Sequence, residues 1–177
     1  MARLLLMRHA KSDWDHPDLA DVDRPLNQRG HRTAAEMGGW LRSQNILPQL
    51  ILVSPACRAQ ETVGRLLTGL GSPHPQVRTV DGLYPGTPAT VLQALGSVSA
   101  ATETLLLVAH NPTMEIVVDM IGGKAEHFPT AAIADIEIPE RPWSAALTDS
   151  VRFFGHCQLR QIWRPRALFE DIDTKKR

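Results

Sequence analysis

Three short runs of consecutive apolar residues constrain the fold of this chain more than any other feature. They lie at residues 4–7, 50–53 and 105–109. Unbroken apolar runs of this length are typical of strands that are buried on both faces, as in a parallel sheet covered by helices. Amphipathic helical patterns separate the runs, at residues 30–44 and 88–95 among others. The alternation predicts a layered α/β domain with a largely parallel sheet.

The segments around these runs complete the expected order of elements. Strands are predicted at residues 2–7, 50–53 and 104–109, and less regular ones at 77–80, 131–138 and 157–163. The polar, aspartate-rich stretch at 11–29 is expected to form a long surface loop. We expect one domain over residues 1–170 and a short basic tail at residues 171–177.

Two helix starts are predicted from a capping residue followed by proline. Ser54 is expected to cap a helix that begins at Pro55, and Asn111 to cap one that begins at Pro112. The second helix would end at the glycine pair at residues 122–123.

Bulk properties exclude several classes of partner. The 177 residues carry a formal net charge of zero, so no overall field attracts nucleic acid or anionic lipid. Cys57 and Cys157 do not form a disulfide scaffold, and reduced thiols are expected. The apolar run at residues 4–7 is too short to cross a bilayer. We therefore expect a cytoplasmic protein without nucleic-acid or membrane partners.

Polar residues with related chemistry follow each of the three main strands. Arg8 and His9 end the first, Arg58 lies just beyond the second, and His110 follows the third. The carboxyl ends of parallel strands meet at one edge of a sheet, so these side chains are expected to converge. Any one of them alone would more often be structural. Together, two imidazoles and two guanidinium groups indicate a pocket for a phosphoryl group.

Such a pocket supports nucleophilic catalysis. A neutral imidazole can attack phosphorus when one ring nitrogen is held by a hydrogen bond and the other faces the substrate, and His9 fits this role. Arg8 and Arg58 would bind the equatorial phosphate oxygens, and a protonated His110 would add a donor. Because cationic side chains supply the charge, no metal or other cofactor is expected.

Other phosphate chemistries do not match the sequence. A cysteine phosphatase needs an arginine six positions after its cysteine, whereas Val63 and Trp163 occupy those positions after Cys57 and Cys157. An aspartyl nucleophile would directly follow an apolar strand. The Asp-Val-Asp segment at 21–23 follows none. There is no glycine-rich loop with Lys-Ser/Thr for a nucleoside triphosphate.

Five segments in this order resemble the histidine phosphatase superfamily, the phosphoglycerate-mutase-like group, and most closely its small phosphohistidine phosphatases of the SixA type. They are Leu-Met-Arg-His-Ala at 6–10, Arg-Pro-Leu-Asn-x-Arg-Gly at 24–30, Val-Ser-Pro-x-x-Arg-Ala-x-x-Thr at 53–62, Val-Ala-His-Asn-Pro at 108–112 and Phe-Pro-Thr-x-Ala-Ile-Ala at 128–134. The resemblance implies a three-layer α/β/α sandwich without a cofactor. It also implies that His9 is the nucleophile and that Arg8, Arg58 and His110 complete the phosphate pocket.

The chain departs from the family pattern at the general acid. Many members place one directly after the second histidine or in the segment after the second arginine. Asn111 occupies the first position, and a neutral amide cannot protonate a leaving group. Asp81 is the candidate for a general acid at the second position. Without an acid, the enzyme would favour leaving groups that depart easily, such as the imidazole of phosphohistidine.

These observations give a leading function and two alternatives. We expect a metal-independent phosphatase that removes phosphate from a phosphohistidine protein through a phosphorylated His9. A small-molecule phosphomonoesterase of the same mechanism, acting on a phosphorylated metabolite, is the second enzymatic interpretation. The third, from another class, is a module that binds phosphoproteins without turnover.

Overall fold

The computed structural model describes residues 1–15, 17–139 and 143–170 of the chain. Within them lie six strands, at Ala2–Arg8 (β1), Leu50–Val53 (β2), Gln76–Thr79 (β3), Thr104–Ala109 (β4), Ile133–Ile138 (β5) and Gln158–Trp163 (β6). The predicted strands are all present, with ends shifted by no more than two residues. The tail predicted at residues 171–177 lies outside the described residues.

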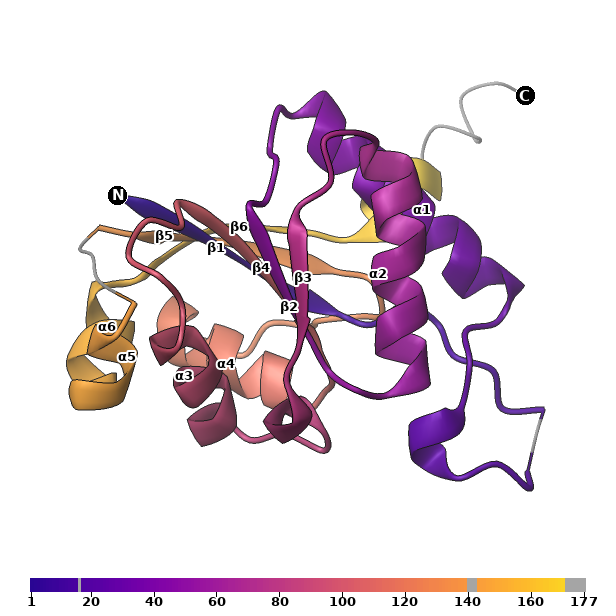
Figure 1. The fold of residues 1–177 in the computed structure, drawn as a ribbon, viewed down its shortest axis with the longest axis horizontal. Coiled ribbons are helices and arrows are strands. Elements are labelled where there is room, and N and C mark those ends of the chain that lie inside the picture. Colours follow the sequence, from indigo (N-terminus) through magenta and orange to yellow (C-terminus); the bar gives the residue numbers. More distant parts are fainter. Residues whose placement is uncertain (16, 140–142, 171–177) are drawn as a thin grey trace.

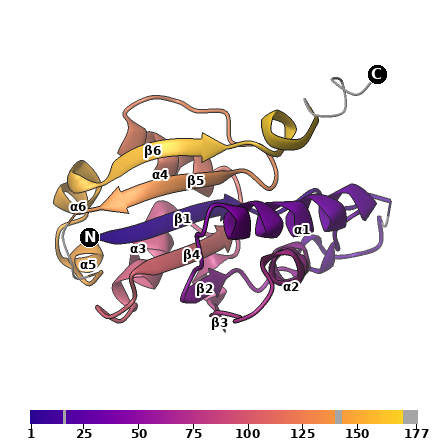
Figure 2. The same ribbon diagram turned by 90° about the horizontal axis from the view of Figure 1, so that it is seen from above.

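The six strands form one sheet in the order β3–β2–β4–β1–β5–β6 (Figure 2). β1 pairs in parallel with β4, and β2 pairs in parallel with β3 and β4. β5 runs antiparallel to both β1 and β6. The expectation of a mostly parallel sheet is therefore confirmed.

Helices cover both faces of this sheet (Figure 1). The helices are α1 (Gln28–Ser43) and α2 (Cys57–Leu70) on one face, and α3 (Pro88–Gly96), α4 (Thr113–Gly122), α5 (Ala145–Thr148) and α6 (Ser150–His156) on the other. α5 and α6 were not predicted, because four and seven residues are too few to show a helical period. The three-layer α/β/α architecture is confirmed. None of the helices in the described ranges is long and apolar enough to cross a bilayer.

The continuous apolar runs are explained by burial on both sides of the sheet. In β1, Leu4 and Leu6 pack in the core beneath α3 and α4, whereas Leu5 and Met7 pack in the core beneath α1 and α2. All four side chains are fully buried. Because successive residues of a strand point to opposite faces, a strand between two helical layers needs apolar residues at every position.

The two predicted capping residues have other partners. α2 begins at Cys57, and its N-cap, Ala56, has no side-chain cap. The Ser54 hydroxyl instead accepts a hydrogen bond from the Ala56 amide and bonds the ring of His110. α4 begins at Thr113, and the Asn111 amide group donates to a carbonyl outside that helix. Both cap predictions were wrong, because a local pattern does not register partners that are distant in sequence.

Glycines bring α1 and α2 into backbone contact. A Cβ atom added at Gly38 of α1 would lie 2.0 Å from the Leu66 carbonyl oxygen, and one at Gly69 of α2 would lie 1.9 Å from that of Ala35. Neither distance is compatible with a methyl group, so the helices cannot approach this closely with any larger residue. The contact holds α2, and with it Arg58, against α1.

Gly38→Ala should therefore destabilise the protein. The added methyl group collides with a backbone oxygen that cannot rotate away, and overpacking of this kind costs about 1–3 kcal/mol. Gly64→Ala in α2 is the matched control, since nothing lies within 4 Å of its added Cβ and alanine favours a helix by up to about 1 kcal/mol. Urea unfolding should show opposite changes in the free energy of unfolding. Equal changes for both variants would contradict the close packing.

Candidate active site

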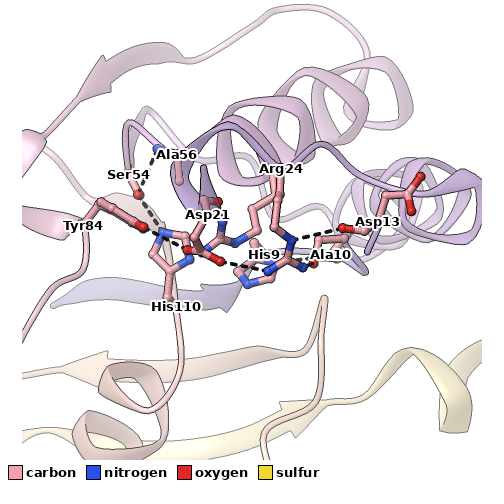
Figure 3. A network of polar contacts seen from close by, with 11 residues as sticks. His9, Ala10, Asp13, Asp21, Arg24, Ser54, Ala56, Tyr84 and His110 are labelled. Carbon is pink, nitrogen blue, oxygen red and sulfur yellow. Dashed lines mark hydrogen bonds and ion pairs between the residues drawn. The ribbon is translucent and has the colours of Figure 1, made fainter. Parts of the chain in front are cut away.

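The carboxyl ends of β1, β2 and β4 lie at one edge of the sheet because these strands are parallel. This edge brings His9 and His110 together, with their ring centroids 5.0 Å apart and their planes tilted by 52° (Figure 3). Both residues are nearly buried, at 8% and 5% exposure. The two imidazoles therefore meet where the sequence predicted, and His9 keeps a small opening to solvent.

One ring nitrogen of His9 is held by its own backbone neighbour. Nδ1 lies 2.7 Å from the carbonyl oxygen of Ala10. A carbonyl can only accept, so Nδ1 carries the hydrogen and the lone pair of the neutral ring lies on Nε2. The Ala10 amide donates to the Thr62 hydroxyl (3.0 Å), which in turn donates to the carbonyl of Arg58 (2.6 Å). This chain of bonds couples the His9 segment to the first turn of α2.

His110 is held from the other side by Ser54. The Ser54 hydroxyl lies 2.7 Å from Nε2 of the ring. Nδ1 is buried and has no hydrogen-bond partner among the described residues. Tyr84 packs edge-on against the same ring, with centroids 5.5 Å apart. A buried ring nitrogen without a partner is unusual, and it leaves a polar atom for a ligand to satisfy.

Arg8 is positioned by the segment that precedes β5. Its Nη1 donates to the carbonyl of Phe128 (3.1 Å), which also accepts from the side-chain amide of Asn111 (3.0 Å). The Nε of Arg8 is buried and, within the described part of the chain, has no partner. One carbonyl thus fixes Arg8 beside the histidines and leaves one of its donors unused.

Arg58 binds an aspartate that was not identified from the sequence. Nη1 and Nη2 of this buried guanidinium donate to the backbone oxygen (2.5 Å) and to Oδ2 (2.9 Å) of Asp21. The same carboxylate accepts from Nη1 of Arg24 and from the hydroxyl of Tyr84, both at 2.8 Å (Figure 3). Asp21 is 53% exposed at the mouth of the site. It occupies donors that would otherwise face a bound anion.

Burial sets the charge state of the two histidines. Desolvation is the main reason that the pKa of His9 falls to about 3 and that of His110 to about 4, and the positive charges of Arg58 and Arg8 lower both further. Both rings are therefore neutral near pH 7 in the absence of a ligand. Partial burial acts to raise the pKa of Asp21, but hydrogen bonds from Tyr84, Arg58 and Arg24 outweigh it and bring it to about 2.

Asp81 lies three residues before Tyr84 in the chain, at the other end of the short segment that carries both residues. It begins the short 3-10 helix Asp81–Leu83 (η2) and is exposed. Its backbone carbonyl accepts from the Tyr84 amide, whereas the contact with Asp21 and His110 comes from Tyr84. The structure thus brings four of the five predicted residues together. The role of Asp81 stays a prediction.

Other chemistries find no support at this site. The Cys57 thiol adjoins Arg58, but partial burial and the charges of Glu61 and Asp23 raise its pKa, so it is not an activated nucleophile. Residues 1–15, 17–139 and 143–170 contain no group of three or more His, Cys, Asp or Glu side chains that could hold a metal ion.

Comparison with known proteins identifies the family. The model of the histidine phosphatase superfamily (branch 1) matches residues 4–84. An uncharacterized protein of Mycobacterium tuberculosis is 39% identical over 144 residues, which cover 75% of this chain and 87% of the relative. The phosphohistidine phosphatase SixA of Escherichia coli is 28% identical over 144 residues, or 78% of this chain and 86% of SixA.

A solved structure agrees with this assignment. The putative phosphohistidine phosphatase SixA from Nakamurella multipartitia superimposes with a TM-score of 0.77 over 93% of this chain and 96% of the other, at 26% identity. The chain belongs to the histidine phosphatase superfamily. It is a phosphatase with the fold of the phosphoglycerate-mutase-like group.

The lowered pKa values predict how stability depends on pH. Both folded-state values lie below the unfolded value near 6.5, so unfolding takes up protons as the pH falls below 6.5. Each histidine should then reduce the free energy of unfolding by up to about 1.4 kcal/mol per pH unit, down to its folded pKa. In urea titrations between pH 6 and 4.5, His9→Asn should show a shallower slope than the native protein. His74→Gln, at an exposed histidine, should not. Parallel slopes for His9→Asn and native protein would refute this.

Proposed function

We propose that this phosphatase removes the phosphoryl group from phosphohistidine on proteins, through a phosphorylated His9. The observation that carries the proposal is the fixed tautomer of His9, whose Nδ1 is held by the Ala10 carbonyl while Nε2 has a free lone pair beside His110. The positive charges of the Arg8 and Arg58 guanidinium groups help to lower the pKa of the same ring. A neutral nucleophile surrounded by cationic donors suits attack on a phosphoryl dianion.

The reaction would proceed in two displacements at phosphorus. In the first, Nε2 of His9 forms a bond to phosphorus as the substrate's N–P bond breaks, and the departing imidazole takes a proton from solvent. In the second, water attacks the phosphorylated His9, its proton passes to solvent, and inorganic phosphate leaves with the ring restored. Arg8 and Arg58 would bind the equatorial oxygens in both steps. The negative charge of the bound group would raise the pKa of His110 and favour a donating, protonated ring.

The acid-base groups of the site favour a substrate whose leaving group departs without a strong general acid to protonate it. Asp21, the carboxylate that contacts Arg58, is ionised because its pKa lies near 2, and Asn111 is an amide. Asp81, the predicted proton donor, is exposed. A phosphoramidate with an imidazole leaving group suits such a site better than an alkyl phosphate, which needs a strong acid. The name of the SixA relative from E. coli agrees with this substrate class.

His9→Ala should abolish turnover. Loss of the nucleophile is expected to lower kcat by at least about a thousandfold, both with a phosphohistidine protein and with p-nitrophenyl phosphate. His74→Ala serves as the control at an exposed histidine. Quenching the native enzyme during turnover in alkaline detergent should trap phosphate on the protein that is stable to alkali and lost in acid, and the His9→Ala variant should trap none.

The same experiment separates the alternatives. Equal inactivity of native and His9→Ala protein on every substrate would leave only a phosphoprotein-binding module. Faster turnover of one sugar or nucleotide phosphate than of phosphohistidine protein would replace the proposed substrate by a small metabolite, with the mechanism unchanged.

Asp21→Asn should increase the affinity for phosphate. The carboxylate competes with a bound dianion for Arg58, and its removal from a half-exposed site is worth up to about 1 kcal/mol, or about fivefold. The measurement is the competitive inhibition constant of inorganic phosphate against p-nitrophenyl phosphate. Asp18→Asn is the matched control, because Asp18 is an exposed aspartate of the same loop and is not the carboxylate that binds Arg58. Weaker inhibition in Asp21→Asn would show instead that Asp21 is needed to hold Arg58 in place.

A further inference from the structure

A second pocket, of about 690 Å³, lies at the same edge of the sheet as the phosphate site. Three parts of the chain line it besides α1: Lys11 after the end of β1, residues 127–131 before β5, and residues 164–169 after β6. α1 contributes residues of its first three turns. None of the residues assigned to the phosphate site lines this pocket.

The pocket adjoins the backbone that carries Arg8 and His9. Lys11 follows His9 by two positions and lines the pocket. The amide of Ala131, another lining residue, donates to the carbonyl oxygens of both Arg8 and His9 at 3.1 Å. A lining proline, Pro129, directly follows the carbonyl that holds Arg8. The pocket therefore lies next to the phosphate site, on the side of Lys11 and α1.

The lining side chains are strongly basic. Those in the described part of the chain carry five positive charges and one negative charge, from Lys11, Arg29, Arg32, Arg164, Arg166 and Glu36. The whole chain has a net charge of zero, so this is a local concentration of cations. Arg164 pairs with Glu126 at 2.8 Å and Arg32 with Glu36 at 3.8 Å, so these two carboxylates leave a surplus of three positive charges, which creates a positive field in the concavity.

We propose that this basic pocket binds carboxylate side chains of the phosphoprotein next to its phosphorylated residue. The inference rests on the proposed function and specifies the substrate further. A pocket of this size accepts a few side chains but not a duplex, and Phe169 is the one Phe, Tyr or Trp among its described lining residues, which is too few to stack successive bases. An acidic peptide segment fits these properties better than nucleic acid. A small metabolite would be too short to occupy both sites.

A pair of charge changes on α1 tests the pocket without touching the catalytic residues. Arg32 and Glu36 lie one helical turn apart, 3.8 Å between Nε and Oε1, and both line the pocket. Arg32→Glu should lower kcat/KM about threefold to fivefold for a phosphohistidine peptide flanked by glutamates, and Glu36→Lys should raise it similarly. Neither variant should change kcat/KM for p-nitrophenyl phosphate or for a serine-flanked phosphohistidine peptide. The preference of the native enzyme for the acidic peptide should weaken at high salt.

Direct binding separates this inference from the proposed function. A fluorescently labelled, unphosphorylated glutamate-rich peptide should bind the native protein more tightly than its serine-rich counterpart, by anisotropy, and Arg32→Glu should weaken that binding. Both binding differences are expected even if phosphohistidine proves not to be the substrate. Equal binding of the two peptides, or an Arg32→Glu variant that binds like the native protein, would overturn the inference. Tighter binding of a single-stranded oligonucleotide than of the acidic peptide would also overturn it.

Discussion

The parallel pairing of β1 with β4 is the interaction on which the site depends. Arg8 lies opposite Ala109 in this register, and the amide of His9 donates to the Ala109 carbonyl at 3.0 Å. His9 and His110 are each the first residue beyond the paired ends. A slip by one residue would turn every side chain of the strand to the other face and separate the two rings. The core on both faces of the sheet opposes such a slip, because it would interchange the two sets of buried side chains.

The site combines buried neutral rings with cationic donors, and this combination has a cost. Desolvation and the nearby guanidinium groups keep His9 and His110 unprotonated. Nε of Arg8 and Nδ1 of His110 are two of the four buried side-chain polar atoms that have no partner among the residues described. Such unmet groups are unfavourable in the folded protein, and a bound phosphoryl group would compensate for them. The Asp21 carboxylate already accepts a hydrogen bond from Arg58, so it would compete with a substrate's phosphoryl group for that donor.

The surroundings of the phosphate site differ on its two sides. On the side of Asp21 and Tyr84, the donors of the site are already engaged by the chain itself. On the side of Lys11 and α1, the backbone of Arg8 and His9 accepts hydrogen bonds from Ala131, which lines the basic pocket. A protein substrate that enters with its phosphoryl group at His9 would therefore meet the ion-paired Asp21 carboxylate on one side and the basic pocket on the other. We expect this difference to orient a bound peptide substrate.

The sequence by itself determined the strands and the residues that follow them. An unbroken apolar run is a local signal, and a polar residue directly after a strand must lie at the sheet edge, so the positions of Arg8, His9 and His110 were predictable. Arg58 was predictable for a related reason, since it stands in the turn that enters the helix after β2. Only the tertiary structure decided that Asp21 binds Arg58, which is 37 positions away along the chain. It also decided that Ser54 bonds a histidine and does not cap a helix. Those contacts depend on how loops fold back over the sheet edge, and no periodicity in the sequence encodes that path.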